Sequence, residues 1–321
     1  MAVLPRSSIG LVVAAALAAA PAATARNTPE ARVTTVDPVL LRDGSAEGMV
    51  VRLSFPSRGR DLPVVILSHG NRLSREDYRP LVAALARAGY LVVQPDHADA
   101  SIGGFAPPGP QPDDVWRTRI EQVRWLAAHP DAPVRSVAAL RGRVDTSRIA
   151  IIGHSFGGHT AALAMGATIE EPDGGRLARH DAPSIRAAVL LAPPGHAAGL
   201  TEEWKRRAPY LKLDWTTMRG PVLTINGGAD MTPLTDRGPG WHDDPYKLGP
   251  VGRDMCLMVV AGAGHYLGGI DSPLRPPAGD ATPERRARVI GATVGFLDAK
   301  LGHGAGAAAA WSGIRAGLDC K

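Results

Sequence analysis

Short apolar runs alternate with amphipathic stretches along most of this chain, and this alternation limits the folds open to it. The apolar runs lie at residues 63–70, 90–97, 148–153, 185–194, 221–228 and 255–264. The helical patterns lie at residues 74–89, 113–129, 158–169 and 282–300. Strands that are apolar on both faces and alternate with helices are typical of a mostly parallel sheet covered by helices on both sides. The sequence therefore predicts an α/β fold.

The two ends of this pattern carry more local signals. Residues 33–41 and 49–55 read as strands separated by turn-forming residues, which predicts an antiparallel pair. Ser74 and Asp77 resemble a capping box, which predicts a helix that begins there. Thr282 precedes a proline and an apolar stripe of helical period, so we expect it to be the N-cap of the last helix.

The N-terminus has the composition of a secretory signal peptide. Arg6 precedes an apolar run at residues 9–20, and small residues lead up to Ala25. The run is shorter than the roughly 20 residues that span a bilayer, which favours cleavage over a membrane anchor. We therefore expect residues 1–25 to be removed and residues 26–321 to form a single exported domain, periplasmic or secreted, without a stable membrane span.

The formal net charge of +5 raises the question of a nucleic-acid partner. Only five of the 36 cationic residues are lysines, and the arginines are scattered without interleaved aromatic residues. This distribution indicates a bias of the whole sequence instead of a binding patch, so we expect no nucleic-acid partner.

Two cysteines, Cys256 and Cys320, occur in the sequence. In an exported chain such a pair predicts a disulfide that would join the C-terminus to an internal strand. The alternative is two unlinked thiols, because the sequence does not show that the two segments meet.

A strand-turn-helix pattern surrounds Ser155. The bare motif Gly-x-Ser-x-Gly is weak, but here it directly follows an apolar strand and directly precedes a helical pattern. Gly153, Gly157 and Gly158 supply the small residues that such a tight turn needs. The pattern predicts that Ser155 is a catalytic nucleophile lifted above the sheet at a helix N-terminus. The alternative is a solvated serine in a glycine-rich turn.

A serine nucleophile needs a base and an orienting carboxylate, and both are expected at later strand ends. Asp230 follows the run at 221–228, and His265 follows the run at 255–264. We expect His265 to take the Ser155 proton and Asp230 to hold its imidazole. His242 also follows Asp230, but its flanks form an irregular polar loop, so His265 is favoured.

The loop around His242 offers two further alternatives. Asp243 and Asp244 are possible substitutes for Asp230 as the acid, and with His242 they could be read as metal ligands. Adjacent positions rarely converge on one ion, so a solvated loop is the favoured interpretation and no metal or cofactor is expected.

The oxyanion of an acyl-transfer intermediate needs preorganised donors. We expect these to be the backbone N–H groups of Phe156, directly after the nucleophile, and of Asn71, in the loop after the strand at 63–70. His69 is interpreted as a residue that braces this loop. Asp96 and His97, at the end of the next strand, receive the same interpretation.

Three tryptophans have two possible roles. The sequence does not decide whether they line an acyl pocket or pack in the core; they are Trp116, Trp125 and Trp215.

With these residues identified, the chain resembles the α/β-hydrolase superfamily. The motifs are "VVILSHG", "DTSRIAIIGHSFGG", "NGGAD" and "GAGH". Within the superfamily it is similar to dienelactone-hydrolase-like proteins, platelet-activating-factor acetylhydrolases and bacterial cutinase-like polyester hydrolases. Dienelactone hydrolases proper use a cysteine where this chain has Ser155. Polyester hydrolases typically have an aromatic residue and a methionine where this chain has Asn71 and Phe156. A C-terminal disulfide is similar to that of secreted cutinases.

The resemblance and the residues together predict a serine carboxylic-ester hydrolase that forms an acyl-enzyme on short or medium acyl esters. The substrate partner would be a small-molecule or lipid-like ester. No long helical insertion resembling a full lipase lid separates the predicted elements, and residues 195–219 could cap the site only partly. The alternatives are an acyltransferase or a polyester hydrolase with the same triad, and a noncatalytic binding protein on the same scaffold. Oligomeric state is not predicted.

Overall fold

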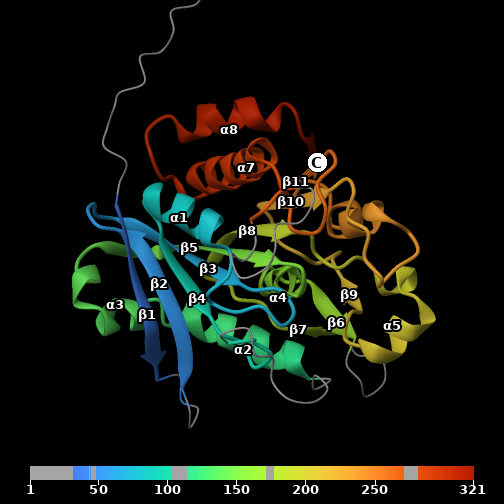
Figure 1. Cartoon of the computed structure of the whole chain (residues 1–321), viewed down its shortest axis with the longest axis horizontal. Coiled ribbons are helices and arrows are strands. Elements are labelled where there is room, and N and C mark those ends of the chain that lie inside the picture. Colours follow the sequence, from blue (N-terminus) through green and yellow to red (C-terminus); the bar gives the residue numbers. More distant parts are fainter. Residues whose placement is uncertain (1–31, 43, 45–47, 103–113, 171–176, 271–280) are drawn as a thin grey trace, which may run out of the picture. The chain divides into compact units, whose positions relative to one another are not determined.

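A twisted sheet runs through the part of the chain that the structure describes (Figure 1). The computed structural model describes residues 32–42, 44, 48–102, 114–170, 177–270 and 281–321. In spatial order the strands of this sheet are β1 (Val33–Leu41), β2 (Met49–Pro56), β4 (Leu91–Pro95), β3 (Leu62–Ser68), β5 (Val144–His154), β8 (Ile185–Leu191), β10 (Val222–Gly227), β11 (Met255–Val260) and β12 (Asp319–Cys320).

The sheet is parallel in its middle and antiparallel at its edges. From β4 to β11 every neighbouring pair is parallel. At one edge β1 and β2 form the predicted antiparallel pair, and β2 also runs antiparallel to β4. At the other edge β12 runs antiparallel to β11. The order confirms the predicted α/β fold, and the parallel strands bring the residues that follow them to one edge of the sheet.

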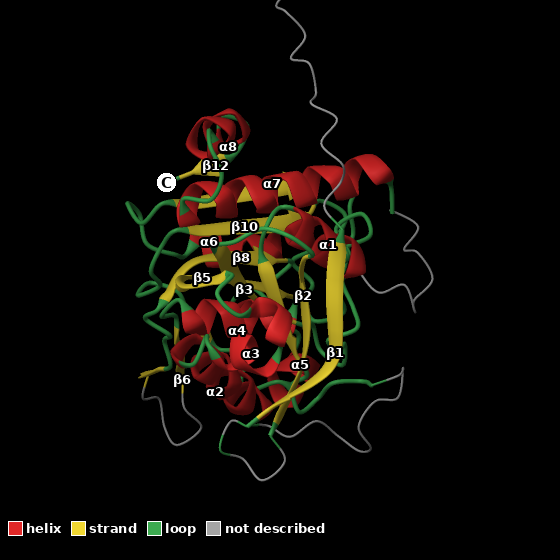
Figure 2. Cartoon of the chain, turned by 90° about the vertical axis from the view of Figure 1, so that its left-hand side faces the viewer, coloured by secondary structure: helices red, strands yellow, loops and turns green. Residues whose placement is uncertain are grey.

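Helices cover both faces of the sheet (Figure 2). On one face α1 (Arg79–Arg87), α7 (Pro283–Leu301) and α8 (Ala307–Arg315) pack over a core that contains Leu85, Phe296 and Trp311. On the other face α2 (Val115–Ala128) and α4 (Phe156–Ala164) pack over a second core. The shorter α3 (Ala132–Ser136) follows α2 in the chain and packs against β1. Because the central strands are covered on both faces, their sequences are apolar throughout instead of alternating between apolar and polar residues.

Helix boundaries follow the predictions at one end of the chain and depart from them at the other. The hydroxyl of Thr282 accepts a hydrogen bond from Arg285 N–H at 3.2 Å, which confirms it as the N-cap of α7. The predicted start of α1 at Ser74 is wrong, because α1 begins at Arg79. The Asp77 carboxylate instead accepts the N–H of Ser74 at 2.7 Å and closes a separate turn.

The weakly periodic segment at 195–219 contains regular structure that the sequence did not predict. It holds α5 (Glu202–Arg207) and β9 (Leu213–Asp214), and β9 pairs with β6 (Thr168–Glu170). β6 in turn pairs with β7 (Leu177–Arg179), so three short strands make a second sheet. The second sheet lies near the starts of β8 and β10, because Ala182 N–H donates to Ala164 O and Arg219 N–H donates to Met165 O. The short α6 (Asp244–Lys247) lies near the start of β11, since Tyr246 bonds to Asp319 of β12.

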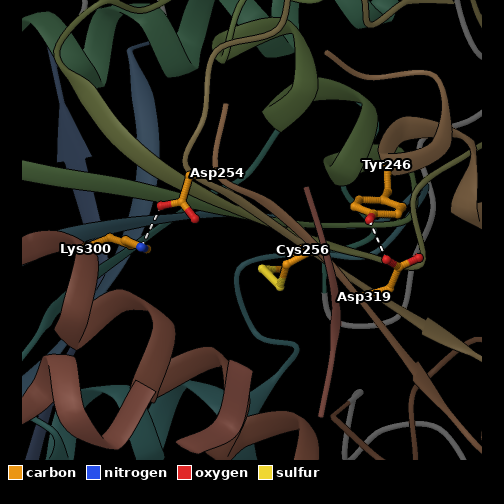
Figure 3. Close-up of a disulfide and its surroundings, with 6 residues drawn as sticks. Tyr246, Asp254, Cys256, Lys300 and Asp319 are labelled. Atoms are coloured by element: carbon orange, nitrogen blue, oxygen red, sulfur yellow. Dashed lines mark hydrogen bonds and ion pairs between the residues drawn. A yellow bond between two sulfur atoms is a disulfide. The ribbon is translucent and has the colours of Figure 1, made fainter. Parts of the chain in front are cut away.

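The predicted disulfide is present. Cys256 and Cys320 face each other across β11 and β12 and are bonded, with their Cα atoms 4.1 Å apart. Figure 3 shows that two other interactions hold the same edge. The Tyr246 hydroxyl donates to the Asp319 carboxylate at 2.8 Å, and Lys300 pairs with Asp254 at 2.6 Å. The C-terminal segment is therefore fixed at the start of β11, the opposite end of that strand from His265.

Two predictions about the N-terminus fall on residues whose structure is not described. The predicted signal peptide at 1–25 and the domain start at residue 26 lie outside the described residues, which begin at residue 32. Among the helices that the structure does describe, none has the length and apolarity of a membrane span.

Candidate active site

Ser155 occupies a sharp turn between β5 and α4. Its backbone has φ 53° and ψ −118°, a conformation that L-residues rarely adopt, and such strain costs about 1–3 kcal/mol. The Ser155 N–H donates to Leu191 O in β8 at 2.8 Å, which ties the turn to the neighbouring strand. The serine is half-buried at the start of a helix that is itself buried along its length.

Glycines around Ser155 allow backbones to approach closely. A Cβ atom on Gly153 would lie 1.9 Å from Gly157 O, within the turn itself. A Cβ on Gly157 would lie 2.0 Å from Ser68 O, at the end of β3. Real Cβ atoms do not reach such distances, so these positions require glycine, as the sequence pattern predicts.

Asp230 and His265 meet above the carboxyl ends of β10 and β11. His265 Nδ1 lies 2.8 Å from Asp230 Oδ2, within hydrogen-bond distance. Asp230 is 1% exposed and His265 is 32% exposed at their side chains, so the carboxylate is enclosed while the imidazole reaches toward solvent. Burial alone would raise the pKa of Asp230, but the adjacent His242 and His265 outweigh it and hold that pKa well below its usual range.

His242 contacts the same carboxylate. Its Nε2 lies 3.2 Å from Asp230 Oδ2, and its side chain is 2% exposed. The sequence favoured His265 over His242 as the partner of Asp230, and the structure brings both to one oxygen atom. We call Asp230, His242 and His265 the carboxylate wall. Their ligand atoms lie within 4.8 Å of one another, so this set could also hold a divalent metal ion.

His154, next to Ser155, joins the turn at Ser155 to the carboxylate wall. Its Nε2 lies 2.9 Å from His265 O, and because a carbonyl only accepts, Nε2 carries the proton. Its Nδ1 therefore accepts from the Tyr78 hydroxyl at 2.9 Å. Tyr78 in turn accepts the N–H of Gly70 at 2.9 Å. Burial lowers the pKa of His154 to about 3, so this ring is neutral and the direction of each bond in the chain is fixed.

The loop that follows β3 rests on a buried arginine. Arg119 of α2 is fully buried and pairs with Asp99 through two bonds of 2.8 and 2.7 Å. The same guanidinium donates to His69 O at 2.7 Å and to Gly70 O at 3.2 Å. Burial works against the Asp99 carboxylate, but Arg119 outweighs it and holds the pKa of Asp99 well below its usual range. We call residues 68–71 with His97, Asp99 and Arg119 the β3 wall.

The β3 wall fixes the peptide that precedes Asn71. Gly70 O accepts from His69 Nδ1 at 2.7 Å as well as from Arg119. A trans peptide points its C=O and N–H in opposite directions, so the N–H of Asn71 is turned away from this buried cluster. Phe156 is the first residue of α4, and its N–H has no acceptor within the helix. The Arg119 guanidinium also lies 4.5 Å from the centre of the Phe156 ring.

The remaining sequence interpretations concern bracing and packing. Asp96 accepts the N–H of Arg75 at 2.9 Å and pairs with its side chain, and His97 lies 2.8 Å from the Ser68 hydroxyl, as bracing residues should. Trp116 and Trp215 are core residues, and Trp125 is half-buried against the core.

The interpretation of the residues around His242 as a solvated loop is wrong, because His242, Asp243 and Asp244 are buried in a 3-10 helix (Pro239–Asp243) and at the start of α6. These three residues are also not a set of converging ligands. Asp243 accepts from Asn226 at 2.8 Å, and Asp244 pairs with Arg237 at 2.7 Å. Both side chains therefore turn to partners other than the ring of His242.

The segment at 195–219 borders a hollow of about 480 Å³. Its lining residues are His196, Ala197, Ala198, Lys205, Lys212, Leu213 and Asp214. The same segment reaches the turn at Ser155 through Tyr210, whose ring lies 5.3 Å from that of Phe156. It reaches the carboxylate wall through His196, whose carbonyl accepts from the indole N–H of Trp241 at 3.0 Å.

Sequence reasoning missed Arg119 and Tyr78. Arg119 carried a signal, because it falls on the apolar stripe of its helix between Trp116 and Val123. Tyr78 carried none, since it lies in a turn just before α1 and reaches its partners through the fold.

This sheet order, with a strained serine after β5 and an Asp–His pair after β10 and β11, defines a class. The chain has an α/β-hydrolase fold and is similar to serine esterases of that superfamily. A model of the chlorophyllase family matches residues 28–172.

Individual relatives give the same result. Cutinase 2 of Thermobifida cellulosilytica is 25% identical over 235 residues, which cover 72% of this chain and 70% of the cutinase. Chlorophyllase-1 of Arabidopsis thaliana is 29% identical over 216 residues, 65% of this chain and 56% of that protein. A bis(hydroxyethyl) terephthalate hydrolase of Streptomyces coelicolor is 25% identical over 158 residues, 49% of this chain. The chain spans only 37% of that hydrolase's length. The motifs in the sequence predict a resemblance to cutinases and acetylhydrolases, and chlorophyllases extend that group.

Proposed function

We propose that this protein is an exported serine carboxylic-ester hydrolase. The observation that carries the proposal is the pairing of His265 Nδ1 with Asp230 Oδ2 at 2.8 Å, above the same sheet edge as the strained Ser155. The disulfide is consistent with export, because such bonds persist in oxidising compartments. Relatives named cutinase, chlorophyllase and terephthalate hydrolase support the ester bond as the target.

The proposed reaction proceeds through an acyl-enzyme. Ser155 Oγ attacks the ester carbonyl while His265 Nε2 takes its proton, and Asp230 stabilises the imidazolium. The N–H groups of Asn71 and Phe156 stabilise the oxyanion. His265 then returns the proton to the departing alcohol, and water repeats the sequence to release the acid and restore Ser155.

The relatives' names also widen the range of substrates to be tried. A cutinase and a terephthalate hydrolase favour polyesters and their small aromatic esters as a second candidate class beside short or medium acyl esters. An acyltransferase reaction would use the same residues and differ only in the acceptor.

The test is steady-state hydrolysis by the purified mature chain of p-nitrophenyl acetate, butyrate, octanoate and palmitate, together with bis(hydroxyethyl) terephthalate. Replacement of Ser155 with Ala should lower kcat by several orders of magnitude and leave the circular dichroism spectrum unchanged. Near-normal hydrolysis by that variant would refute the assignment. An inactive protein whose Ser155 does not react with a fluorophosphonate would favour a noncatalytic binding protein.

A further inference from the structure

Tyr78 has a backbone conformation that aromatic residues rarely adopt. It lies in the turn before α1 with φ 62° and ψ 27°, in the left-handed region. Its ring is fully buried, and its carbonyl accepts the N–H of Val82 at 2.9 Å. Such strain persists only where surrounding contacts fix a residue, and it gathers at functional sites. The contacts of the Tyr78 hydroxyl therefore indicate what the strained turn holds in place.

The Tyr78 hydroxyl contacts two segments at once. It lies 2.9 Å from Gly70 N and 2.9 Å from His154 Nδ1. A backbone N–H only donates, so the oxygen accepts from Gly70 and its own proton is directed to Nδ1 of His154. At the far side of that ring, Nε2 lies 2.9 Å from His265 O, which only accepts. We call these three hydrogen bonds the tyrosine bridge, and they join the loop after β3 to the loop after β11.

Gly70 packs directly on the tyrosine bridge. A Cβ atom there would lie 3.1 Å from His154 Nδ1 and 3.3 Å from the Tyr78 oxygen, closer than side chains normally approach. On its carbonyl side, Gly70 O accepts from Arg119 at 3.2 Å. Arg119 therefore holds this residue within the β3 wall, whereas the tyrosine bridge fixes its position relative to the loop after β11. Because both ends of Gly70 are bonded, the following N–H of Asn71 has a fixed direction as well.

We propose that Tyr78 is a positioning residue that couples the oxyanion donor at Asn71 to the main chain of His265. The tyrosine bridge keeps the donor and the base at one fixed separation, with Ser155 between them. Tyr78 does not touch the ester, because its side chain is fully buried and acts through the bridge. This inference rests on the proposed function, which gives Asn71 and His265 their roles.

Loss of the tyrosine bridge should affect the transition state more than the bound ester. The oxyanion forms only during the reaction, so a donor without a fixed position weakens binding of the transition state and not of the substrate. One neutral hydrogen bond of this kind corresponds to about a tenfold effect. The expected signature is therefore a fall in kcat at unchanged KM.

The first test removes only the hydroxyl, by Tyr78→Phe. We expect kcat on p-nitrophenyl butyrate to fall about tenfold. The inhibition constant of an alkyl trifluoromethyl ketone should rise by the same factor, because this inhibitor forms an oxyanion on the serine. The matched control is Tyr90→Phe, which removes the hydroxyl of another fully buried tyrosine, one that donates to Asp298. The control should change neither constant.

Three outcomes of this test would overturn the proposal. They are an unchanged kcat in Tyr78→Phe, a fall in kcat without the matching rise in the inhibition constant, and equal losses in Tyr78→Phe and Tyr90→Phe.

The second test needs no activity. In the full mature chain labelled with ¹⁵N, Tyr78→Phe should shift two backbone amide signals. One is that of Asn71, next to one end of the tyrosine bridge, and the other is that of Tyr266, whose peptide group contains His265 O at the other end. Tyr90→Phe should shift neither. A shift confined to Asn71 would overturn the coupling, whereas shifts at both positions in a protein that hydrolyses no ester would support the coupling and refute the proposed function.

If Tyr78→Phe does not fold, hydrogen exchange in the wild type decides. The Gly70 N–H should exchange slowly, since its acceptor is a buried hydroxyl. Exchange at the rate of an exposed amide would overturn the proposal.

Discussion

The β3 wall and the carboxylate wall hold their buried histidines in opposite ways. In the β3 wall, His69 donates from Nδ1 to Gly70 O, and its Nε2 accepts the N–H of His97 at 3.1 Å. Burial lowers the pKa of His69 to about 3, with the Arg119 charge adding to the effect. In the carboxylate wall, two histidines share Asp230. One wall is therefore a fixed neutral frame around an Arg–Asp pair, whereas the other is built around a charge that would change in the proposed reaction.

The comparison teaches that preorganisation and proton transfer require different surroundings. Donors for an oxyanion work best when their dipoles do not move, and neutral, fully bonded partners supply that rigidity. A base must gain and lose a proton, so it needs a carboxylate on one side and access to the reactants on the other. The exposure of His265 and the burial of Arg119 follow this division.

Among the changes that test the difference between the two walls, we expect replacement of Arg119 to have the largest effect on turnover. Replacement of Arg119 with Met frees Gly70 O and leaves Asp99 as an unpaired buried charge. We expect kcat to fall about 10- to 100-fold with KM little changed, because the donor at Asn71 loses its fixed direction.

The control for this prediction also removes the charge of Asp99, which Arg119→Met leaves unpaired. In the double variant Arg119→Met with Asp99→Asn, the several kcal/mol that an uncompensated buried charge costs should be recovered, as measured by urea unfolding. The loss of kcat should remain. Full recovery of kcat in the double variant would show that Arg119 matters only for stability.

A moderate effect is expected from acid, and it falls on the buried neutral histidines of the β3 wall and around Ser155. The folded-state pKa values of His69 and His154 are about 3, below the ordinary value of 6.5. Between these values the unfolded chain binds protons that the folded chain does not. The free energy of unfolding should therefore decrease as pH falls from 6.5 toward 3, by about 1.4 kcal/mol per pH unit for each such histidine.

Urea unfolding of the Ser155→Ala variant at pH 7, 6 and 5 would measure this slope without interference from activity. His159→Gln removes one histidine of the same kind and should reduce the slope. A free energy of unfolding that stays constant between pH 7 and pH 5 would contradict the interpretation that these buried histidines are neutral in the folded chain.

The smallest effect on turnover is expected from the disulfide, which lies away from both walls. Loss of both cysteines by Cys256→Ala and Cys320→Ala should leave kcat and KM unchanged. The closed loop spans 64 residues, for which chain entropy gives about 4 kcal/mol of stability. Thermal unfolding with and without reductant measures this loss, and a change in kcat would show that the β11 edge is coupled to the carboxylate wall.

Sequence patterns were sufficient for the parts of this molecule that local chemistry determines. The parallel sheet follows from apolar runs alternating with helical patterns, and the turn at Ser155 follows from glycines at fixed offsets. Asp230 and His265 could be paired because each directly follows a strand, and parallel strands end at one edge.

Other features depend on contacts that no local pattern encodes. His242 reaches Asp230 because the 3-10 helix that carries it folds back over β10, and its polar flanks gave no sign of that path. Tyr78 lies 76 residues before His154 in the chain and still bonds to it. The false helix start at Ser74 has a different origin, since the local bond from Ser74 N–H to Asp77 does form but closes a separate turn, and α1 begins only at Arg79.

The close approach of Gly157 to Ser68 O has a consequence for protein engineering. Because backbone touches backbone there, exchanging side chains cannot change the spacing between the turn at Ser155 and the end of β3. Libraries that vary the turn at Ser155 or the end of β3 should therefore yield mostly inactive proteins. Variation that retunes substrate range belongs at Tyr210, where a side chain instead of the backbone meets the ring of Phe156.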